Sequence, residues 1–324
     1  MPLLEINELE VRYPAGHGAA LGRAVVDGVS LSVEAGRCVG LVGESGCGKT
    51  TLGRAVLGLV PHQGGTIRFD GALVGEMTRR AMMKYRRLAQ MVFQDPLGSL
   101  DPRQTIGSAI GEVLHVHRVC PPAAVAGRVA ELLQMVGLAP EFARRYPHET
   151  SGGQRQRVGI ARVLALAPRL IIADEPVSAL DVSIQAQVLN LFKDLQQSLG
   201  FACLFIAHDL AVVRYMCSEV QVMFMGRIVE SGPCADVIDQ PRHPYTRQLL
   251  ESVPRLDGGV PPRSVPAVSK SGDTVAGAPA GRGCVYAPRC PECSAACMRE
   301  MPPLMTGSAG RSVACFGAGA RKMT

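Results

Sequence analysis

Short apolar runs alternate with longer amphipathic stretches from about residue 3 to residue 240. The apolar runs are CVGLV (38–42), LIIAD (170–174), ACLFIAH (202–208) and VQVMFM (220–225). Helical patterns lie between them, including residues 123–137 and 183–199. Apolar runs of this length, bounded by turns and separated by helices, are typical of buried strands in a largely parallel sheet. The pattern therefore predicts an α/β fold.

The same pattern divides the chain into parts. Residues 76–150 lie between the first two of these strands and look mostly helical. We interpret this stretch as containing most of an inserted helical subdomain, whose bounds we put at about residues 95–165, within a domain that spans residues 1–250. Residues 251–283 are rich in Pro, Gly, Ser and Ala, which predicts a linker or arm. Residues 284–324 form a small Cys-rich C-terminal appendage.

The composition limits which partners are expected. Of the 324 residues 47% are apolar, which is enough for one large domain plus an appendage. Aromatic residues make up only 4% and Trp is absent, which argues against a surface that stacks nucleic-acid bases. The net charge is +6, and one group of basic residues is dense: Arg79, Arg80, Lys84, Arg86 and Arg87. We interpret this group as a solvated helix face, with a surface near lipid headgroups as the alternative, and expect no nucleic-acid partner.

Membrane insertion is not expected from this sequence. No segment approaches the 18 or more continuous apolar residues of a membrane-spanning helix. The first residues include Glu5, Glu8 and Glu10 and lack the basic start and apolar core of a signal peptide. We therefore expect the chain to stay in the cytoplasm and to reach a membrane only through protein partners.

A glycine-rich segment follows the first buried strand and has the spacing of a phosphate-binding P-loop. Its residues are Gly43, Glu44, Ser45, Gly46, Cys47, Gly48, Lys49 and Thr50, and Thr51 follows directly. Glycines allow backbone N–H groups to converge on phosphate oxygens, and the next helix directs its positive end at the same charge. We expect Lys49 to reach the terminal phosphates and the Thr50 hydroxyl to bind Mg²⁺.

The segment LIIADEP (170–176) supplies a second part of the same site. Asp174 ends the apolar run, so its carboxylate is expected beside the P-loop, where it would hold Mg²⁺. Glu175 can orient and deprotonate the attacking water. These residues alone predict a nucleotide hydrolase.

Three further motifs give a resemblance to a known family. They are SGGQ (151–154), SALD (178–181) and AHD (207–209). With the P-loop and LIIADEP they make five motifs in the order found in ATP-binding cassette ATPases, which the chain resembles over roughly residues 3–250. The resemblance implies a RecA-like core with an N-terminal β subdomain, ATP and Mg²⁺ as ligands, and hydrolysis of ATP to ADP and phosphate.

In that family each ATP lies between the P-loop of one subunit and the signature of another. The resemblance therefore implies that Ser151, Gly152, Gly153 and Gln154 contact the γ-phosphate bound by a partner subunit. A helix that begins at SGG also presents N–H groups and a positive end to negative charge. Thr150 departs from the family, which usually has Leu there, and we expect no loss of activity from it.

The resemblance assigns four more positions. Gln94 would approach Mg²⁺ and the attacking water and would pass motion to the transmembrane subunits. His208 would contact the γ-phosphate and Asp181 would lie at the dimer seam. Tyr13 stands where the family places an aromatic ring against adenine. No residue of the family's site is missing, which argues against a subunit that only binds ATP.

The finer pattern resembles one branch of the family. GESGCGK, VFQDPLGSLDPR and PRHPYT are similar to dipeptide and oligopeptide importer ATPases, and the ending VACF is most similar to the second, F-type ATPase of dipeptide importers. This implies two permease subunits, a different D-type ATPase as heterodimer partner, and a substrate-binding protein that acts indirectly. It also implies a peripheral location on the cytoplasmic face of the inner membrane.

Two alternatives remain for the function. An importer ATPase for nickel, glutathione or haem shares much of this pattern, and the cassette does not touch its cargo. A soluble cassette ATPase of DNA repair or translation would usually carry tandem cassettes, coiled-coil arms or an inserted zinc module, and this chain shows one cassette and no heptad arm.

The appendage has a group of cysteines. Cys284, Cys290, Cys297 and Cys315 are spaced C-x5-C-x6-C-x17-C, with Cys293 between the second and the third. Four thiolates can hold zinc or an iron–sulfur cluster, or the thiols can stay reduced and pack in a small domain. The resemblance implies a [4Fe–4S] cluster with a structural role, because importer ATPases have a tail of this spacing.

Overall fold

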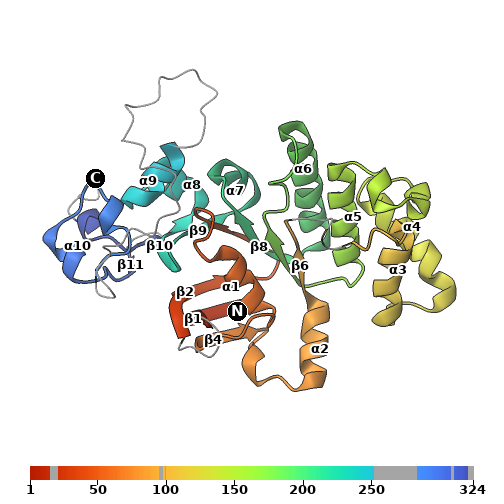
Figure 1. Cartoon of the computed structure of the whole chain (residues 1–324), viewed down its shortest axis with the longest axis horizontal. Helices are drawn as coiled ribbons and strands as arrows, with labels where there is room; N and C mark the ends of the chain where they lie inside the picture. Colours follow the sequence, from red (N-terminus) through yellow and green to blue (C-terminus); the bar gives the residue numbers. More distant parts are fainter. Residues whose placement is uncertain (15–20, 95–97, 99, 252–282, 308–309, 320–324) are drawn as a thin grey trace.

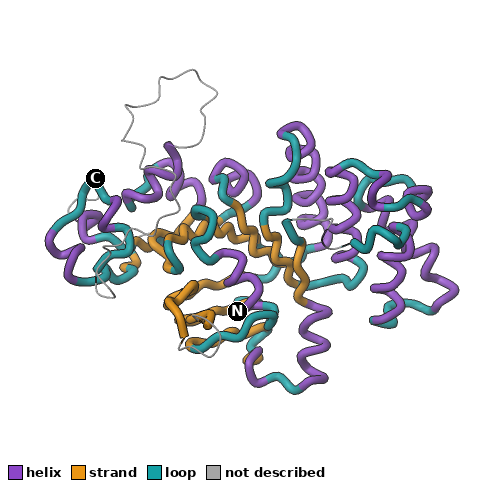
Figure 2. The backbone as a smooth tube through the Cα atoms, in the orientation of Figure 1, coloured by secondary structure: helices purple, strands orange, loops and turns teal. Residues whose placement is uncertain are grey.

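The structure of the chain is a computed structural model with two sheets as its framework (Figures 1 and 2). It describes residues 1–14, 21–94, 98, 100–251, 283–307 and 310–319. The predicted linker at 251–283 lies outside these ranges except for its two end residues.

The larger sheet has eight strands, and five of them are parallel. In spatial order they are β11 (Met305–Thr306), β12 (Ser312–Val313), β10 (Arg227–Pro233), β9 (Glu219–Phe224), β3 (Cys38–Val42), β8 (Ala202–Ala207), β7 (Leu170–Asp174) and β6 (Ala89–Val92). The run from β9 to β6 is parallel, and β10 and β12 continue the sheet antiparallel. The four strands predicted from apolar runs are confirmed as β3, β7, β8 and β9, and the α/β fold is confirmed with them.

The strand β6 was missed by the sequence analysis, which interpreted residues 76–150 as mostly helical. β6 has only four residues and includes the polar Gln90, so it gives no apolar run of the kind that marked the others. Parallel pairing with β7, Ala89 opposite Leu170, brings it into the sheet. Tertiary pairing therefore determines this strand more than its own pattern does.

The second sheet has four antiparallel strands and lies under the first, together with α1 (Lys49–Val56) (Figure 1). Its strands are β1 (Leu4–Pro14), β2 (Leu21–Val33), β4 (Gly64–Phe69) and β5 (Ala72–Leu73). Side chains alternate across β3: Val39 and Leu41 join the apolar core with α1, whereas Cys38 and Val42 join the core on the opposite face. The β3 strand is therefore buried on both faces, as the sequence predicts for a central parallel strand.

The remaining helices pack on both faces and at the two ends of the large sheet, with α2 on the same face as α1 (Figures 1 and 2). They are α2 (Arg79–Leu88), α3 (Ile106–Val116), α4 (Val125–Met135), α5 (Gly152–Leu164), α6 (Val182–Leu199), α7 (Leu210–Met216), α8 (Cys234–Asp239), α9 (Pro244–Glu251) and α10 (Ala295–Arg299). The two predicted helices at 123–137 and 183–199 are confirmed as α4 and α6. The basic group lies on α2, whose one buried residue is Tyr85. Within the described ranges, no helix is both long and apolar enough to cross a membrane.

The Cys-rich appendage is joined to the cassette through β10. Strand β12 pairs antiparallel with β10, Glu230 opposite Val313. Glu230 is fully buried, and its carboxylate accepts a hydrogen bond from Arg311 at 3.0 Å and from the backbone N–H groups of Arg242 and His243 at 2.9 Å. A buried carboxylate needs such partners, because an unpaired charge in a low-dielectric interior is very costly. Removal of the appendage would therefore leave this charge without its counter-ion.

Acid should weaken this junction through His243. Burial, with a smaller contribution from the positive charge of Arg247, lowers the pKa of His243 from 6.5 to about 4. The neutral ring accepts a hydrogen bond from the Tyr245 N–H at 3.1 Å. Between pH 6.5 and about 4 the unfolded chain binds the extra proton and the folded protein does not, so stability falls as the pH falls. The full effect is about 3 kcal/mol.

The variant His243→Asn keeps an acceptor near Nδ1 but cannot take up a proton. We expect its free energy of unfolding, relative to the wild type, to improve as the pH falls through this window. Denaturant unfolding at several pH values measures the difference, with the exposed His115→Asn as control. Parallel pH profiles for the wild type and His243→Asn would contradict this account.

Candidate functional site

The P-loop connects β3 to α1, and two glycines in it fit where no side chain could. Gly43 has φ 159°, and a Cβ there would lie 2.1 Å from the Met223 carbonyl oxygen. Gly48 has φ 109°, and a Cβ there would lie 2.4 Å from the Val25 carbonyl oxygen. Close backbone approach therefore requires glycine at both positions. This arrangement presents the loop's backbone to a ligand at the N-terminus of α1.

Lys49 lies under this loop with only 4% of its surface exposed. Its ammonium donates to the carbonyl oxygens of Gly43 at 2.7 Å and Glu44 at 3.1 Å, and lies 4.0 Å from a Glu175 oxygen. These partners satisfy the hydrogen-bonding needs of the buried ammonium and fix its position beside the loop. The neighbouring Cys47 is also buried, and burial raises the pKa of its thiol despite the nearby Lys49 charge. Cys47 therefore packs as a neutral thiol and is no nucleophile.

Thr50 and Asp174 form a pair that suits Mg²⁺. The Thr50 hydroxyl donates to Asp174 Oδ1 at 3.0 Å, and Asp174 is 4% exposed. Burial raises the pKa of Asp174, which a bound cation would reverse. Two oxygens that bind one octahedral Mg²⁺ at about 2.1 Å lie roughly 3 Å apart. The spacing and the chemistry of both groups therefore fit the ion.

Glu175 follows directly at the end of β7. Its backbone has φ 46°, an uncommon conformation for a residue other than glycine, and its N–H donates to the Ile206 carbonyl at 3.0 Å. Strained backbone of this kind gathers at functional sites. Its carboxylate Oε2 lies 3.1 Å from Nδ1 of His208, which follows β8. The structure thus brings a carboxylate, an imidazole and the P-loop lysine together, which is the geometry that a general base needs.

Tyr13 lies at the end of β1 near the same loop. Its ring is 41% exposed, and its hydroxyl lies 3.5 Å from the Thr51 hydroxyl. An exposed ring beside the P-loop is available to stack on a base.

The signature segment begins α5. Ser151 caps the helix, because its hydroxyl accepts from the Gln154 N–H at 3.3 Å while the Gln154 side chain accepts from the Ser151 N–H at 2.9 Å. A Cβ on Gly153 would lie 2.4 Å from Ile184 Cγ2, so glycine allows α5 to pack on α6. Thr150 is buried, and its hydroxyl donates to the Pro147 carbonyl at 2.7 Å. The polar side chain in place of the family's Leu is therefore satisfied locally.

The signature does not join the P-loop within this chain. Helices α5 and α1 are well separated in Figure 1. Asp181 precedes α6 and is exposed, and Val182 beside it is 82% exposed. Gln94 is exposed two residues after β6. The P-loop, Asp174, Glu175 and His208 therefore form one group, whereas the signature and Asp181 face elsewhere.

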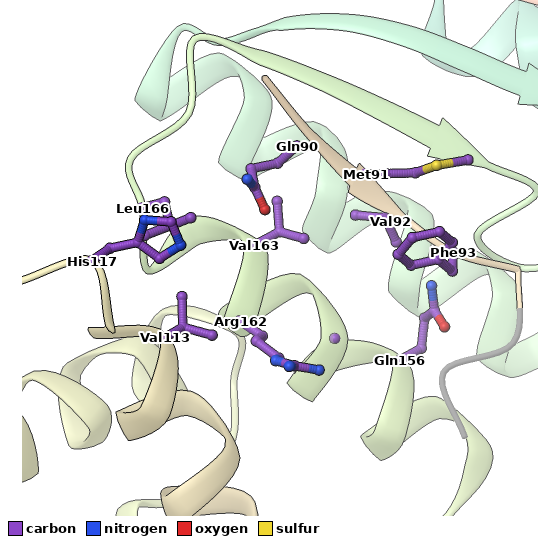
Figure 3. Close-up of a pocket in the computed structure, with 11 residues that line it drawn as sticks. Gln90, Met91, Val92, Phe93, Val113, His117, Gln156, Arg162, Val163 and Leu166 are labelled. Carbon is purple, nitrogen blue, oxygen red and sulfur yellow. The ribbon is translucent and has the colours of Figure 1, made fainter. Parts of the chain in front are cut away.

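A pocket of about 380 Å³ lies between the end of β6 and the helices α3 and α5. In Figure 3 Gln90 to Phe93 form one wall, Val113 and His117 come from α3 and its end, and Gln156, Arg162 and Val163 come from α5. Its lining is apolar with a few polar groups, as in a recognition groove.

Four of the five cysteines of the appendage are the predicted cluster ligands, Cys284, Cys290, Cys297 and Cys315. Burial is the largest cause that raises the pKa of Cys284 and of Cys290, and the charge of Cys315 would raise both further. The Cys284 N–H also donates to the Cys297 carbonyl at 2.7 Å. In the part of the chain that the structure describes, no set of three or more His, Cys, Asp or Glu side chains is arranged to hold a metal ion.

The sequence did not reveal two contacts to the P-loop. Both are made to Glu44, one by Tyr245 of α9 and one by Arg289 of the appendage. Tyr245 lies in PRHPYT, which the sequence analysis used only as a mark of the family branch. Nothing in the spacing of that motif indicates its partner.

Two family models match parts of this chain. Residues 26–178 match the family model described as ABC transporter, and residues 229–297 match that described as oligopeptide/dipeptide transporter, C-terminal region. A Brucella ovis protein that carries the name peptide import ATP-binding protein is 47% identical over 97% of this chain and 98% of its own length. The glutathione import ATP-binding protein GsiA of Pectobacterium atrosepticum is 53% identical over 79% of this chain, which spans only 42% of that relative.

Solved structures agree on the fold. CbiO1 of Clostridium perfringens, described as part of the ABC transporter complex CbiONQ, superposes with a TM-score of 0.65 at 28% identity, over 74% of this chain and 91% of its own. The ATP-binding cassette MJ0796, a dimer in a post-hydrolysis state with ADP and phosphate, gives a TM-score of 0.63 at 26% identity, over 71% and 98%.

The role of Glu175 can be tested by Glu175→Gln, which keeps shape and hydrogen bonding but removes the basic carboxylate. We expect ATP to bind with near-normal affinity and turnover to fall by about 100-fold or more. Equilibrium nucleotide binding and phosphate release measure the two quantities. The exposed Glu219→Gln serves as control. Normal turnover in Glu175→Gln would exclude Glu175 as the base.

Proposed function

The chain belongs to the ATP-binding cassette ATPases of the peptide-import type, and on that premise we propose that its ATP hydrolysis drives uptake of di- and oligopeptides. The observation that carries the cargo class is the match of residues 229–297 to the oligopeptide/dipeptide C-terminal region, with relatives named for peptide import over nearly the whole chain. Glutathione is itself a small peptide, so the name of GsiA agrees with this cargo class.

Within the chain each group of the site has one task in this proposal. Lys49 and the P-loop N–H groups bind the phosphates, and Tyr13 stacks on adenine. Thr50, Asp174 and Gln94 would hold Mg²⁺, which would supply positive charge to offset that of the phosphates. Glu175 takes the proton of the attacking water, and His208 orients Glu175 and contacts the γ-phosphate. The strained φ of 46° at Glu175 and the hydrogen bond from its N–H to Ile206 fix its backbone, and the 3.1 Å contact with His208 orients its carboxylate.

The signature requires a second cassette. Ser151, Gly152, Gly153 and Gln154 begin α5 away from this chain's P-loop, so they would serve an ATP bound by the partner. Val182, 82% exposed beside Asp181, adds an apolar contact that such a partner would cover. We propose a different, D-type ATPase as that partner. ATP then joins the two subunits, and hydrolysis lets them separate.

The importer ATPases of this family act with transmembrane permease subunits. We propose that a permease helix docks in the pocket between β6, α3 and α5 (Figure 3). Gln94 directly follows the β6 wall, so movement of the docked helix and movement at the nucleotide site would be linked there. This docking also places the chain at the cytoplasmic face of the inner membrane, with a substrate-binding protein on the other side.

The pocket proposal can be tested with Gly159→Phe. Gly159 lines the pocket, and a Cβ there meets no atom within 4 Å, so a side chain can start there and its phenyl ring would occupy the groove. We expect the variant to bind ATP normally but to lose co-purification with the permeases and peptide-stimulated ATPase activity. Gly127→Phe, on the exposed face of α4 with the same free space, is the matched control.

The purified wild-type complex tests the function itself. Two permeases and a second ATPase should co-purify from native membranes, and peptide-loaded binding protein should stimulate ATP hydrolysis. Stimulation by another cargo and not by peptides would overturn the cargo class. Normal co-purification of Gly159→Phe would overturn only the docking site.

We also propose that the appendage binds a [4Fe–4S] cluster through Cys284, Cys290, Cys297 and Cys315. Thiolates are the ligands that such clusters take, and a backbone hydrogen bond of 2.7 Å from Cys284 to Cys297 already brings two of the four residues together. They are not arranged as a metal-holding set, so the turns that carry them would close on binding. A small appendage with few large apolar residues gains stability from such a clip.

Anaerobic purification tests the cluster. We expect about four iron atoms and four sulfides per chain, with the visible absorbance of an iron–sulfur cluster. Cys290→Ser should lose the iron, whereas Cys293→Ser, whose thiol is exposed, should keep it. One zinc ion per chain, or no metal in protein that was never exposed to air, would overturn the proposal.

A further inference from the structure

The P-loop and the Cys-rich appendage meet at Glu44, the second residue of the loop. Arg289 Nη1 donates to Glu44 Oε2 at 2.9 Å and Nη2 donates to Oε1 at 2.8 Å. This is the two-bond geometry in which guanidinium and carboxylate match best. Arg289 belongs to the segment that matches the C-terminal region, and Glu44 to the cassette. The contact therefore joins the two family regions at the nucleotide site itself.

The backbone of Glu44 is held as well. Its N–H donates to the hydroxyl of Tyr245 at 2.8 Å, and its carbonyl accepts from Lys49 Nζ at 3.1 Å. Tyr245 is fully buried, and burial raises the pKa of its phenol, so the hydroxyl stays neutral. The N–H, the carbonyl and the carboxylate of Glu44 each have a partner. Two of these three partners lie outside the P-loop and its helix.

An aromatic cluster holds the two residues that contact Glu44, Tyr245 and Arg289, in fixed positions. The ring of Tyr245 lies 4.6 Å from Phe224 and 5.6 Å from Tyr286, and Tyr286 lies 5.2 Å from Phe224. The Arg289 guanidinium lies 5.5 Å from the centre of the Phe224 ring. Tyr286 also donates to Gln248 at 2.6 Å. Packed rings of this kind restrict the rotamers of Tyr245 and Arg289, so the two partners of Glu44 are fixed in advance of any ligand.

The charge of Glu44 gives the contact a consequence for ATP. A carboxylate in a loop that binds polyphosphate repels the ligand, and an adjacent guanidinium cancels much of that repulsion. The two side chains are 42% and 36% exposed, so solvent reduces the effect to a modest size.

We propose that Arg289 and Tyr245 are positioning residues for ATP binding, through which the appendage and helix α9 together set the affinity of the P-loop for MgATP. Arg289 neutralises the Glu44 carboxylate. Tyr245 orients the peptide group between Gly43 and Glu44, whose carbonyl oxygen accepts a hydrogen bond from Lys49. The inference rests on the proposed role of this site in binding ATP. It gives the appendage a second role, besides stabilising the edge of the large sheet through the pairing of β12 with β10.

A charge cycle in the full chain tests the proposal. Arg289→Ala should raise the Kd and KM for MgATP about three- to fivefold while kcat stays within about twofold. The double variant Glu44→Gln/Arg289→Ala should recover most of that loss, because no uncompensated carboxylate remains. A merely structural role for Arg289 would give no such recovery. Tyr245→Phe, which removes the hydroxyl but keeps the ring packing, should weaken binding in the same direction.

Arg169→Ala is the matched control. Arg169 forms the same two-bond pair with Asp70, at 2.6 and 3.1 Å, and neither residue belongs to the nucleotide site. It should leave the affinity for MgATP unchanged. Unchanged affinity in Arg289→Ala, or no recovery in the double variant, would overturn the inference. Wild-type protein that binds MgATP but drives no peptide uptake would instead overturn the proposed cargo. The charge cycle would still test the roles of Arg289 and Tyr245, because it measures only the affinity for MgATP.

Discussion

The parallel hydrogen-bonded ladder of β7, β8, β3 and β9 is the constraint on which the rest of the structure depends. Of these strands β3, β7 and β8 are buried along their whole length, so their charged side chains come only at or after their ends. Because parallel strands end at one edge, the P-loop after β3, Asp174 and Glu175 at β7, and His208 after β8 meet there. The charged groups of the site therefore lie side by side along this edge of the sheet, where Lys49 and Asp174 are each only 4% exposed.

Much of this arrangement could be predicted from the sequence because it is local. A P-loop needs glycines where backbone approaches backbone, and Gly43 against Met223 is such a place. Asp174 directly ends an apolar run, so its position at the sheet edge followed from the pattern. The capping box of Ser151 and Gln154 is equally local. Each of these is a relation between a few neighbouring residues and one element.

The rest could not be predicted, since it depends on pairings between distant segments. Strand β6 has a pattern too short to stand out, and only β7 makes it a strand. The bond between Tyr245 and Glu44 joins a motif just past the cassette to the loop at its centre. The cysteine spacing indicates a kind of ligand, but thiol chemistry alone left zinc, an iron–sulfur cluster and reduced thiols open. The signature residues lie away from the P-loop of their own chain, so a role for them in binding ATP can be inferred only when a second subunit is considered.

The pairing of β12 with β10 bears on how the chain folds as well as on what it binds. Until β12 arrives, β10 is an open edge strand, and Glu230 inside it lacks its guanidinium. During synthesis the cassette would emerge first, and for that interval its sheet would offer unpaired backbone groups to any other nascent chain. The appendage thus covers, late in synthesis, an edge strand that could otherwise pair with other chains. Slow docking of the appendage would appear first as aggregation in the cell.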